Sequence, residues 1–193
     1  LWQKVEILLQ EGRPKSAGEV LENIRSQAVG AGDRGQELAA FLAASGCRQT
    51  LTPDSLFPDI ILLRRRVEGA KDVAERAVCA SSLARILSAC RWRGVSTVSD
   101  WQAPIDSVHL WSREQFEEEA RHWYLVSMTA PDTLAERQAS EYFPIIEPGT
   151  DRELYAGDLL NLMVRRAVEG LVGLGQRDEA IACLHQALKV YRN

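Results

Sequence analysis

The spacing of apolar residues is the feature that most restricts what this chain can fold into. In the closing segment, Ala180 and Ile181 are followed by apolar residues three or four positions apart as far as Tyr191. A helix brings such positions onto one face, so this spacing predicts an amphipathic α-helix. No segment alternates convincingly with the period of two that a half-buried strand needs. The predicted fold class is therefore all-α, built of antiparallel helical hairpins with a few long irregular loops.

Further helices are indicated by the same spacing together with capping and helix-breaking residues. Gly12 ends a first helix, and Pro14 suits the start of a second, because an N–H is unpaired in a first turn anyway. Ser112 and Gln115 match a capping box, and Asp158 is a candidate cap. The expected helices cover residues 2–11, 14–28, 38–42, 57–67, 72–91, 112–127, 131–139, 159–174 and 180–191, and the expected loops cover 30–35, 46–56, 94–107 and 144–149.

The segment 175–188 resembles the second half of a tetratricopeptide repeat. Its first glycine turns the chain, while Ala180 and Ala187 are small enough for neighbouring helices to approach closely. The preceding helix departs from the repeat, with Val164 and Val168 at the positions of its usual Trp and Gly. No regular array with a period of about 34 residues is present. The sequence therefore predicts hairpins with tetratricopeptide-like packing and no standard repeat series.

Composition limits the classes of function. The 193 residues carry a net charge of -4, which argues against a nucleic-acid partner, because such a surface must neutralise phosphates. No run of about 18 apolar residues occurs, so no membrane-spanning segment is expected. The cysteines stand singly, without metal-ligand spacing, and are expected to be buried thiols: Cys47, Cys79, Cys90 and Cys183.

The chain is expected to form a single helical domain over residues 1–193 of a larger multidomain protein. It begins with Leu1, not Met, and it stops at Asn193 directly after a strong helical pattern. Both ends are typical of a fragment of something longer.

No catalytic, cofactor or metal site is predicted, and the chain is not expected to be an enzyme. The sequence motifs of zinc proteases, serine hydrolases and P-loop nucleotide-binding proteins are absent. Glu118 and His122 lie one helical turn apart and would supply half a metal site, but a solvated ion pair is the commoner explanation. The glycines within 170–175 follow a helix and not a strand, which indicates a helix end. The basic run 64–66 and the acidic run 117–119 are interpreted as solvated faces.

Tryptophans are unusually frequent between residues 92 and 123. Large aromatic side chains commonly anchor a core or a domain interface, and they also dominate many partner-binding surfaces. Both interpretations remain open at this stage. If partner binding applies, Trp101 and Trp111 are the candidate partner-binding residues.

Several short phrases, in order along the chain, resemble the N-terminal helical region of the large alpha-2-macroglobulin-like proteins of Bacteroidetes bacteria. The family typically has a tryptophan helix, a GLPKSA turn and a second helix, and here the turn reads GRPKSA with Arg13 in place of Leu. The phrase Pro-x-Leu-Tyr-Asp of the family is replaced by AGDLL at 156–160. The phrases that carry the resemblance are Leu1–Ile24, Ile61–Arg91, Trp111–Ser127, Tyr142–Ile146, Arg152–Tyr155 and Asp158–Ala167.

The resemblance implies an accessory helical domain that precedes the β-domains of an envelope-associated or secreted protease trap. Many such traps use an internal thioester with a CGEQ-type motif, and no cysteine here is followed by Gly-Glu-Gln. The implied role is a non-catalytic scaffold or interaction domain of a protease-inhibitor family, in the periplasm, the cell envelope or outside the cell. The implied partners are other domains of the same polypeptide and another protein. The alternative is a free-standing cytoplasmic adaptor that binds a peptide or protein in a helical groove.

Overall fold

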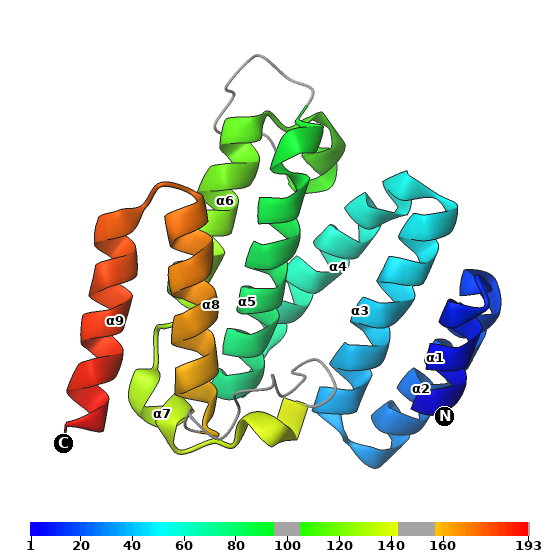
Figure 1. Ribbon diagram of the computed structural model, residues 1–193, viewed down its shortest axis with the longest axis horizontal. Coiled ribbons are helices and arrows are strands. Elements are labelled where there is room, and N and C mark those ends of the chain that lie inside the picture. Colours follow the sequence, from blue (N-terminus) through cyan, green and yellow to red (C-terminus); the bar gives the residue numbers. More distant parts are fainter. Residues whose placement is uncertain (95–104, 143–156, 193) are drawn as a thin grey trace. The chain divides into compact units, whose positions relative to one another are not determined.

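The structure is a computed structural model that describes residues 1–94, 105–142 and 157–192. Within these ranges the chain forms nine α-helices and four short 3-10 helices, with no β-strand (Figure 1). A single isolated bridge joins Gln138 and Asp158. The all-α prediction is confirmed. The loop expected over 144–149 lies outside the described residues, and so does the one expected over 94–107, except for Gly94 and for residues 105–107, which form the start of a 3-10 helix and not a loop.

Two compact units make up the chain, and each is described by itself. Unit 1 consists of Leu1–Asp59 and Ser140–Thr150, while unit 2 consists of Ile60–Ala139 and Asp151–Asn193. The single domain predicted over 1–193 stays a prediction.

Unit 1 begins with α1 (Trp2–Gln10), α2 (Pro14–Ala31) and α3 (Arg34–Leu51). Gly12 has a φ of 69°, a left-handed conformation that favours glycine, and Pro14 is the first residue of α2, as predicted. The helices bury small and aliphatic side chains between them. The core of unit 1 consists of Val5, Leu8, Ala17, Leu21, Ile24, Ala40, Ala44 and Cys47.

Helix α3 is longer than the sequence pattern suggested. It is capped by Asp33 and continues to Leu51, so the loop predicted over 46–56 is wrong for its first half. Beyond residue 42 the buried face of α3 is carried by Ala44 and Cys47. These side chains are too small to mark a helix clearly by their spacing. The 3-10 helix η1 (Pro53–Ser55) then leads into the next helix.

Of the glycines expected to form the connection between α2 and α3, only one shapes the turn. Gly32 ends α2 with a φ of 70°. Gly30 and Gly35 lie inside the helices. A Cβ atom on Gly35 would overlap the backbone carbonyl of Glu141, so this glycine permits a close approach within unit 1.

Helix α4 (Leu56–Gly69) is divided between the units after Asp59. In unit 1, the buried carboxylate of Asp59 accepts a hydrogen bond of 2.8 Å from Nη2 of Arg48. In unit 2, the same helix buries an aliphatic stripe with helical spacing: Ile60, Leu63 and Val67.

Helix α5 (Val73–Cys90) lies at the centre of unit 2. It packs against α6 (Arg113–Val126), α7 (Pro131–Ala135) and α8 (Leu159–Gly173). Because most of its residues are small or aliphatic, α5 is buried around much of its circumference. The helix predicted over 131–139 is shorter than expected, because α7 ends at Ala135. Three 3-10 helices complete the described chain: η2 (Arg91–Arg93), η3 (Ile105–Leu110) and η4 (Ala139–Tyr142).

Side-chain caps begin two helices of unit 2, α6 and α8, at the predicted places. Ser112 accepts a hydrogen bond of 3.2 Å from the backbone N–H of Gln115, whose side chain accepts one of 2.7 Å from the N–H of Ser112. This reciprocal pair is the predicted capping box. Asp158 begins α8 by accepting a hydrogen bond of 2.8 Å from the N–H of Asn161.

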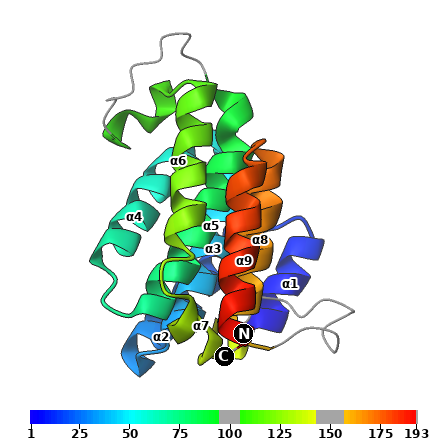
Figure 2. The same ribbon diagram turned by 90° about the vertical axis from the view of Figure 1, so that its left-hand side faces the viewer.

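The last hairpin of unit 2 consists of α8 and α9 (Arg177–Tyr191), which lie side by side (Figures 1 and 2). Gly175 turns the chain between them with a φ of 81°. Ala180 and Ala187 of α9 are buried, as the predicted close packing requires. On its other side α8 packs against α5 and α6, and a Cβ atom on its Gly170 would overlap the ring of Tyr124. No helix in the described part of the chain is long and apolar enough to cross a membrane.

Candidate interaction surface

Of the two predicted partner-binding tryptophans, Trp111 lies within the described residues, and it is not on the surface. Trp111 is only 3% exposed, and its ring meets the edge of Phe116 at a centroid distance of 5.4 Å. Its ring is packed inside unit 2, in agreement with the core interpretation, and its assignment to a partner surface stays a prediction. Trp123 is buried as well, and its indole N–H donates to Glu119 over 3.0 Å. Trp101 lies outside the described residues.

Trp92, which sequence reasoning did not select, is the exposed tryptophan of the described chain, with 67% of its surface accessible. Its ring lies 5.0 Å from the guanidinium of Arg91 and 4.3 Å from that of Arg113. Such cation–π contacts hold an exposed ring in a defined position. The sequence around Trp92 does not indicate this arrangement, because Arg113 belongs to α6 and lies far from Trp92 along the chain.

The two residues considered above as half a metal site, Glu118 and His122, are engaged in ordinary surface contacts. Glu118 pairs with Arg121 at 2.6 Å, and the ring of His122 meets that of Trp123 at 4.8 Å. Within the described residues, no group of three or more His, Cys, Asp or Glu side chains is placed to hold a metal ion.

The basic run 64–66 fans out as expected, but it is not simply a solvated face. Arg64 forms an ion pair of 2.9 Å with Glu68. Arg66 donates from Nη2 and Nε to Oε1 of Glu75, at 3.0 and 3.2 Å, and the Glu75 carboxylate is almost fully buried. The solvated interpretation is therefore wrong for Arg66, because α5 brings a buried acid within its reach.

Burial makes the cysteines poor nucleophiles at neutral pH. All four are free and buried, as predicted. Burial raises the pKa of Cys90 to about 11, and it also raises the pKa of Cys47 and of Cys183. A thiol reacts through its thiolate form, so these residues are better described as core side chains than as catalytic groups.

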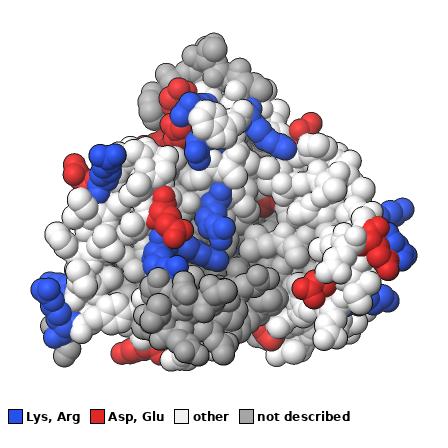
Figure 3. Space-filling view, viewed as in Figure 1, with Lys and Arg blue, Asp and Glu red and all other residues white. Residues whose placement is uncertain are grey.

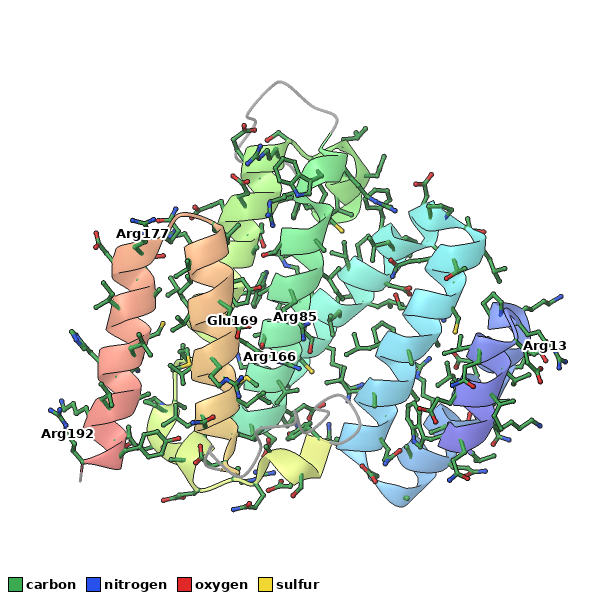
Figure 4. The ribbon with its side chains drawn as sticks, in the orientation of Figure 1. Arg13, Arg85, Arg166, Glu169, Arg177 and Arg192 are labelled. Carbon is green, nitrogen blue, oxygen red and sulfur yellow. The ribbon has the colours of Figure 1, made fainter. Side chains whose placement is uncertain are left out.

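A basic group lies between α5 and α8 in unit 2. Figure 4 places Arg85 on α5 near Arg166 and Glu169 on α8. Burial, together with the neighbouring charge of Arg85, lowers the pKa of Arg166 to about 10. Arg166 is therefore still protonated at neutral pH, so the group supplies positive charge and no acid–base chemistry.

A row of exposed apolar side chains follows α9 in unit 2. Ile181, Leu184 and Leu188 are 49%, 42% and 49% exposed, and their spacing places them along one edge of the helix. Tyr191 extends this edge by one turn and remains about half exposed. We call these four residues the α9 stripe. Figure 3 shows basic side chains at both ends of α9, with an acidic side chain beside the upper one and uncharged residues in white between the two ends.

The α9 stripe arises because the helix has two apolar edges and packs with only one of them. Ala180, Cys183 and Ala187 form the buried edge. Glu179 faces α6, where its Oε2 accepts a hydrogen bond of 2.8 Å from Nε of Arg121. These contacts orient α9 and leave the larger aliphatic side chains outside. Isolated exposed leucines are common on proteins, but a continuous row on one helix indicates an interaction surface.

Positively charged residues border the α9 stripe. Figure 4 shows Arg177 at one end of α9 and Arg192 at the other. A groove of about 410 Å³ runs beside Leu188 and is lined also by His185, Lys189 and Arg192. The arrangement offers apolar contact along the helix and cationic contact at its margin.

Comparison with known proteins adds no relative: no family model matches the chain, and the searches of curated proteins and of solved structures found no match either.

Proposed function

We propose that the chain is a non-catalytic helical domain with a scaffold or protein-interaction role, and that it is an accessory part of an alpha-2-macroglobulin-like envelope protein. The observation that carries the interaction role is the α9 stripe, a row of exposed aliphatic side chains on a helix whose other edge is packed. A peptide or protein helix buries such a row by placing its own apolar residues at matching spacing.

The family assignment rests on the ordered phrases of the sequence, beginning with the GRPKSA turn. This phrase starts at Gly12, which follows the first helix with a positive φ, and it continues into the first turn of α2, which begins at Pro14. The hairpins of both units suit a spacer or docking domain. The engagement of Glu118 with Arg121, and the burial of the thiols, also favour a role without chemistry.

The family proposal is tested by the size and location of the native protein. An antibody raised against residues 1–193 is used to probe envelope and cytosolic fractions of the cells that make the protein. We expect a polypeptide several times larger than this chain in the envelope or periplasmic fraction. A band of the chain's own size in the cytosol would reject the envelope role and support the free-standing adaptor.

The interaction role is tested by site-specific crosslinking from the α9 stripe. A photoreactive amino acid replaces Leu184 or Leu188 in the native protein, with the exposed Leu62 of α4 as the matched control position. We expect crosslinks from α9 to a defined segment of the same polypeptide or to one partner, and none of that kind from position 62. Equal or absent crosslinking from both helices would contradict an interaction role for this surface.

A further inference from the structure

The charges beside the α9 stripe restrict the chemistry of its partner. The exposed cations are Arg177 in the first turn and Lys189 and Arg192 at the other end of the helix. Of the two acidic residues of α9, Glu179 is paired with Arg121, and Asp178 is exposed. The margin of the stripe is therefore net positive, although the whole chain has a net charge of -4.

These charges disfavour a second copy of the chain as the occupant. If two α9 helices packed in antiparallel orientation, Arg177 of one copy would face Lys189 and Arg192 of the other, and Asp178 would offset only one of these charges. If they packed in parallel, identical cations would lie side by side. Like charges that approach across an interface weaken it and select against that pairing. An acidic partner gains attraction from the same residues.

A helix fits this surface better than an extended strand or a membrane. The exposed positions 181, 184 and 188 repeat at three and four residues, which is the spacing a facing helix matches with its own i, i+3 and i+7 residues. α9 is also held in a hairpin by its buried Ala180 and Ala187, and it therefore has only one narrow apolar edge to offer. A membrane-surface helix normally inserts a wide apolar face.

Resting on the interaction role proposed above, we propose that the α9 stripe binds an amphipathic helix whose apolar face is bordered by acidic residues. Leucine-sized side chains of that helix pack on Ile181, Leu184 and Leu188. Its carboxylates lie near Arg177 at one end and near Lys189 and Arg192 at the other. The apolar row supplies affinity, and the charges select the partner and its direction.

The proposal is tested with three fluorescein-labelled synthetic helical peptides and the full 193-residue chain. The peptides share leucines at helical spacing and differ only in their flanking residues, which are all Glu, all Gln or all Lys. Binding is measured by fluorescence anisotropy at low and high salt. We expect the Glu peptide to bind about 10-fold tighter than the Gln peptide, and salt to reduce this preference because exposed charges are screened.

Variants of α9 separate the two components of binding. Leu184→Ser with Leu188→Ser should weaken every peptide by at least about 10-fold, since it removes apolar anchors. Arg177→Glu with Arg192→Glu should reverse the preference in favour of the Lys peptide. Leu62→Ser, on the exposed face of α4, is the matched control and should change neither the affinity for the peptides nor the preference among them. Circular dichroism verifies that each variant is folded.

The outcomes distinguish this proposal from the interaction role on which it rests. Equal binding of the three peptides, lost in the serine variant, would overturn the acidic partner and keep the stripe as a docking site. Failure of the folded chain to bind any peptide would overturn both the acidic helix and the stripe as a helix-binding surface. Concentration-dependent dimerisation that the serine variant abolishes would replace the proposed partner with a second copy. Cosedimentation with phosphatidylserine-containing vesicles, lost in the same variant, would replace it with a membrane.

Discussion

Helices α5 and α9 belong to the same unit and both carry apolar residues at helical spacing, yet they differ sharply in burial. Twelve of the 18 residues of α5 are buried, compared with three of the 15 residues of α9. α5 packs against α6, α7 and α8, whereas α9 packs mainly against α8 and touches α7. The buried residues of α5 include alanines, serines and cysteines, while the exposed ones of α9 include leucines and isoleucine.

The difference shows that the number of neighbouring helices decides burial more than the size of the side chain. A small residue on a central helix is enclosed because other helices surround it. A large residue on a peripheral helix remains exposed unless another molecule or segment covers it. α5 therefore carries the stability of unit 2, and α9 presents the surface that we assign to interaction.

The largest expected contrast is between Leu83 of α5 and Leu188 of α9. Leu83 is fully buried, so Leu83→Ala should lower the free energy of unfolding by about 3 kcal/mol, through lost burial and a residual cavity. Leu188 is half exposed, and Leu188→Ala should change the free energy of unfolding by less than about 0.5 kcal/mol. Urea unfolding followed by circular dichroism measures both in the same unit. Similar losses for the two variants would contradict the division of roles.

Ion pairs sharpen the comparison at the next level. The Glu75 carboxylate of α5 is 3% exposed, so Arg66→Ala leaves a buried charge poorly compensated and should cost about 2 kcal/mol. The pair of Arg121 with Glu179 of α9 is about one-third exposed, and Arg121→Ala should cost less than about 1 kcal/mol. A double-mutant cycle with Glu75→Gln isolates the coupling of the first pair. A coupling energy close to zero would show that Arg66 does not stabilise the buried carboxylate of Glu75.

Alanine substitution at the N-cap should lower the free energy of unfolding by about 1 kcal/mol more at α5 than at α9. Asp72 accepts a hydrogen bond of 2.8 Å from the N–H of Glu75, and Asp72→Ala should cost about that amount. Gln176 makes no side-chain cap bond at α9, so Gln176→Ala should be nearly neutral. Thermal and urea unfolding of the two alanine variants checks this order.

The Asp72 cap also predicts a pH dependence. Burial acts to raise the pKa of Asp72, but the hydrogen bond from Glu75 N–H and the ion pair with Arg137 outweigh it and lower the pKa below the ordinary value of 3.8. The stabilisation is therefore complete above that ordinary value and is lost as pH falls through the lower folded pKa. Asp72→Asn keeps a capping side chain without a titrating carboxyl. The difference in the free energy of unfolding between this variant and the wild type, measured by urea unfolding at several pH values, should change only in this acidic range. A difference that is the same at every pH would reject the ionic contribution of Asp72.

The smallest effect is expected at the end of α9. The hydroxyl of Tyr191 donates a hydrogen bond of 2.7 Å to Asp158, the residue that caps α8. Tyr191→Phe should cost about 0.5 kcal/mol, because the pair is partly exposed and the ring remains. Hydrogen exchange in the last turn of α9 should accelerate, while exchange in α5 stays unchanged. Acceleration in α5 as well would show that α9 is not a peripheral element.

The Tyr191 bond should weaken at high pH. Burial and the hydrogen bond to Asp158 raise the pKa of Tyr191 well above its ordinary value of 10.0. Its contribution is therefore fully present below pH 10 and is lost as pH rises through the raised folded pKa. The wild type and Tyr191→Phe should consequently have the same free energy of unfolding at strongly alkaline pH. Urea unfolding of both proteins at increasing pH measures this convergence.

Most of the fold was predictable because helix formation depends on local spacing and on local caps. Gly12, Ser112 with Gln115, and Asp158 occupy the predicted helix boundaries. The continuation of α3 to Leu51 was missed, since its buried residues there are as small as Ala44. The candidate surface was much less predictable, because exposure depends on neighbours from distant parts of the chain. Trp111 was selected and is buried, whereas Trp92 was passed over and is exposed.

The positions of the helices follow from the sequence alone, because apolar spacing, caps and left-handed glycines act within a few residues. The sequence also predicts one apolar face for α9, which carries small side chains along one edge and large ones along the other. Tertiary packing covers only the first of these edges, because the small residues let α9 pack closely on α8. The larger Ile181, Leu184 and Leu188 thereby remain on the surface.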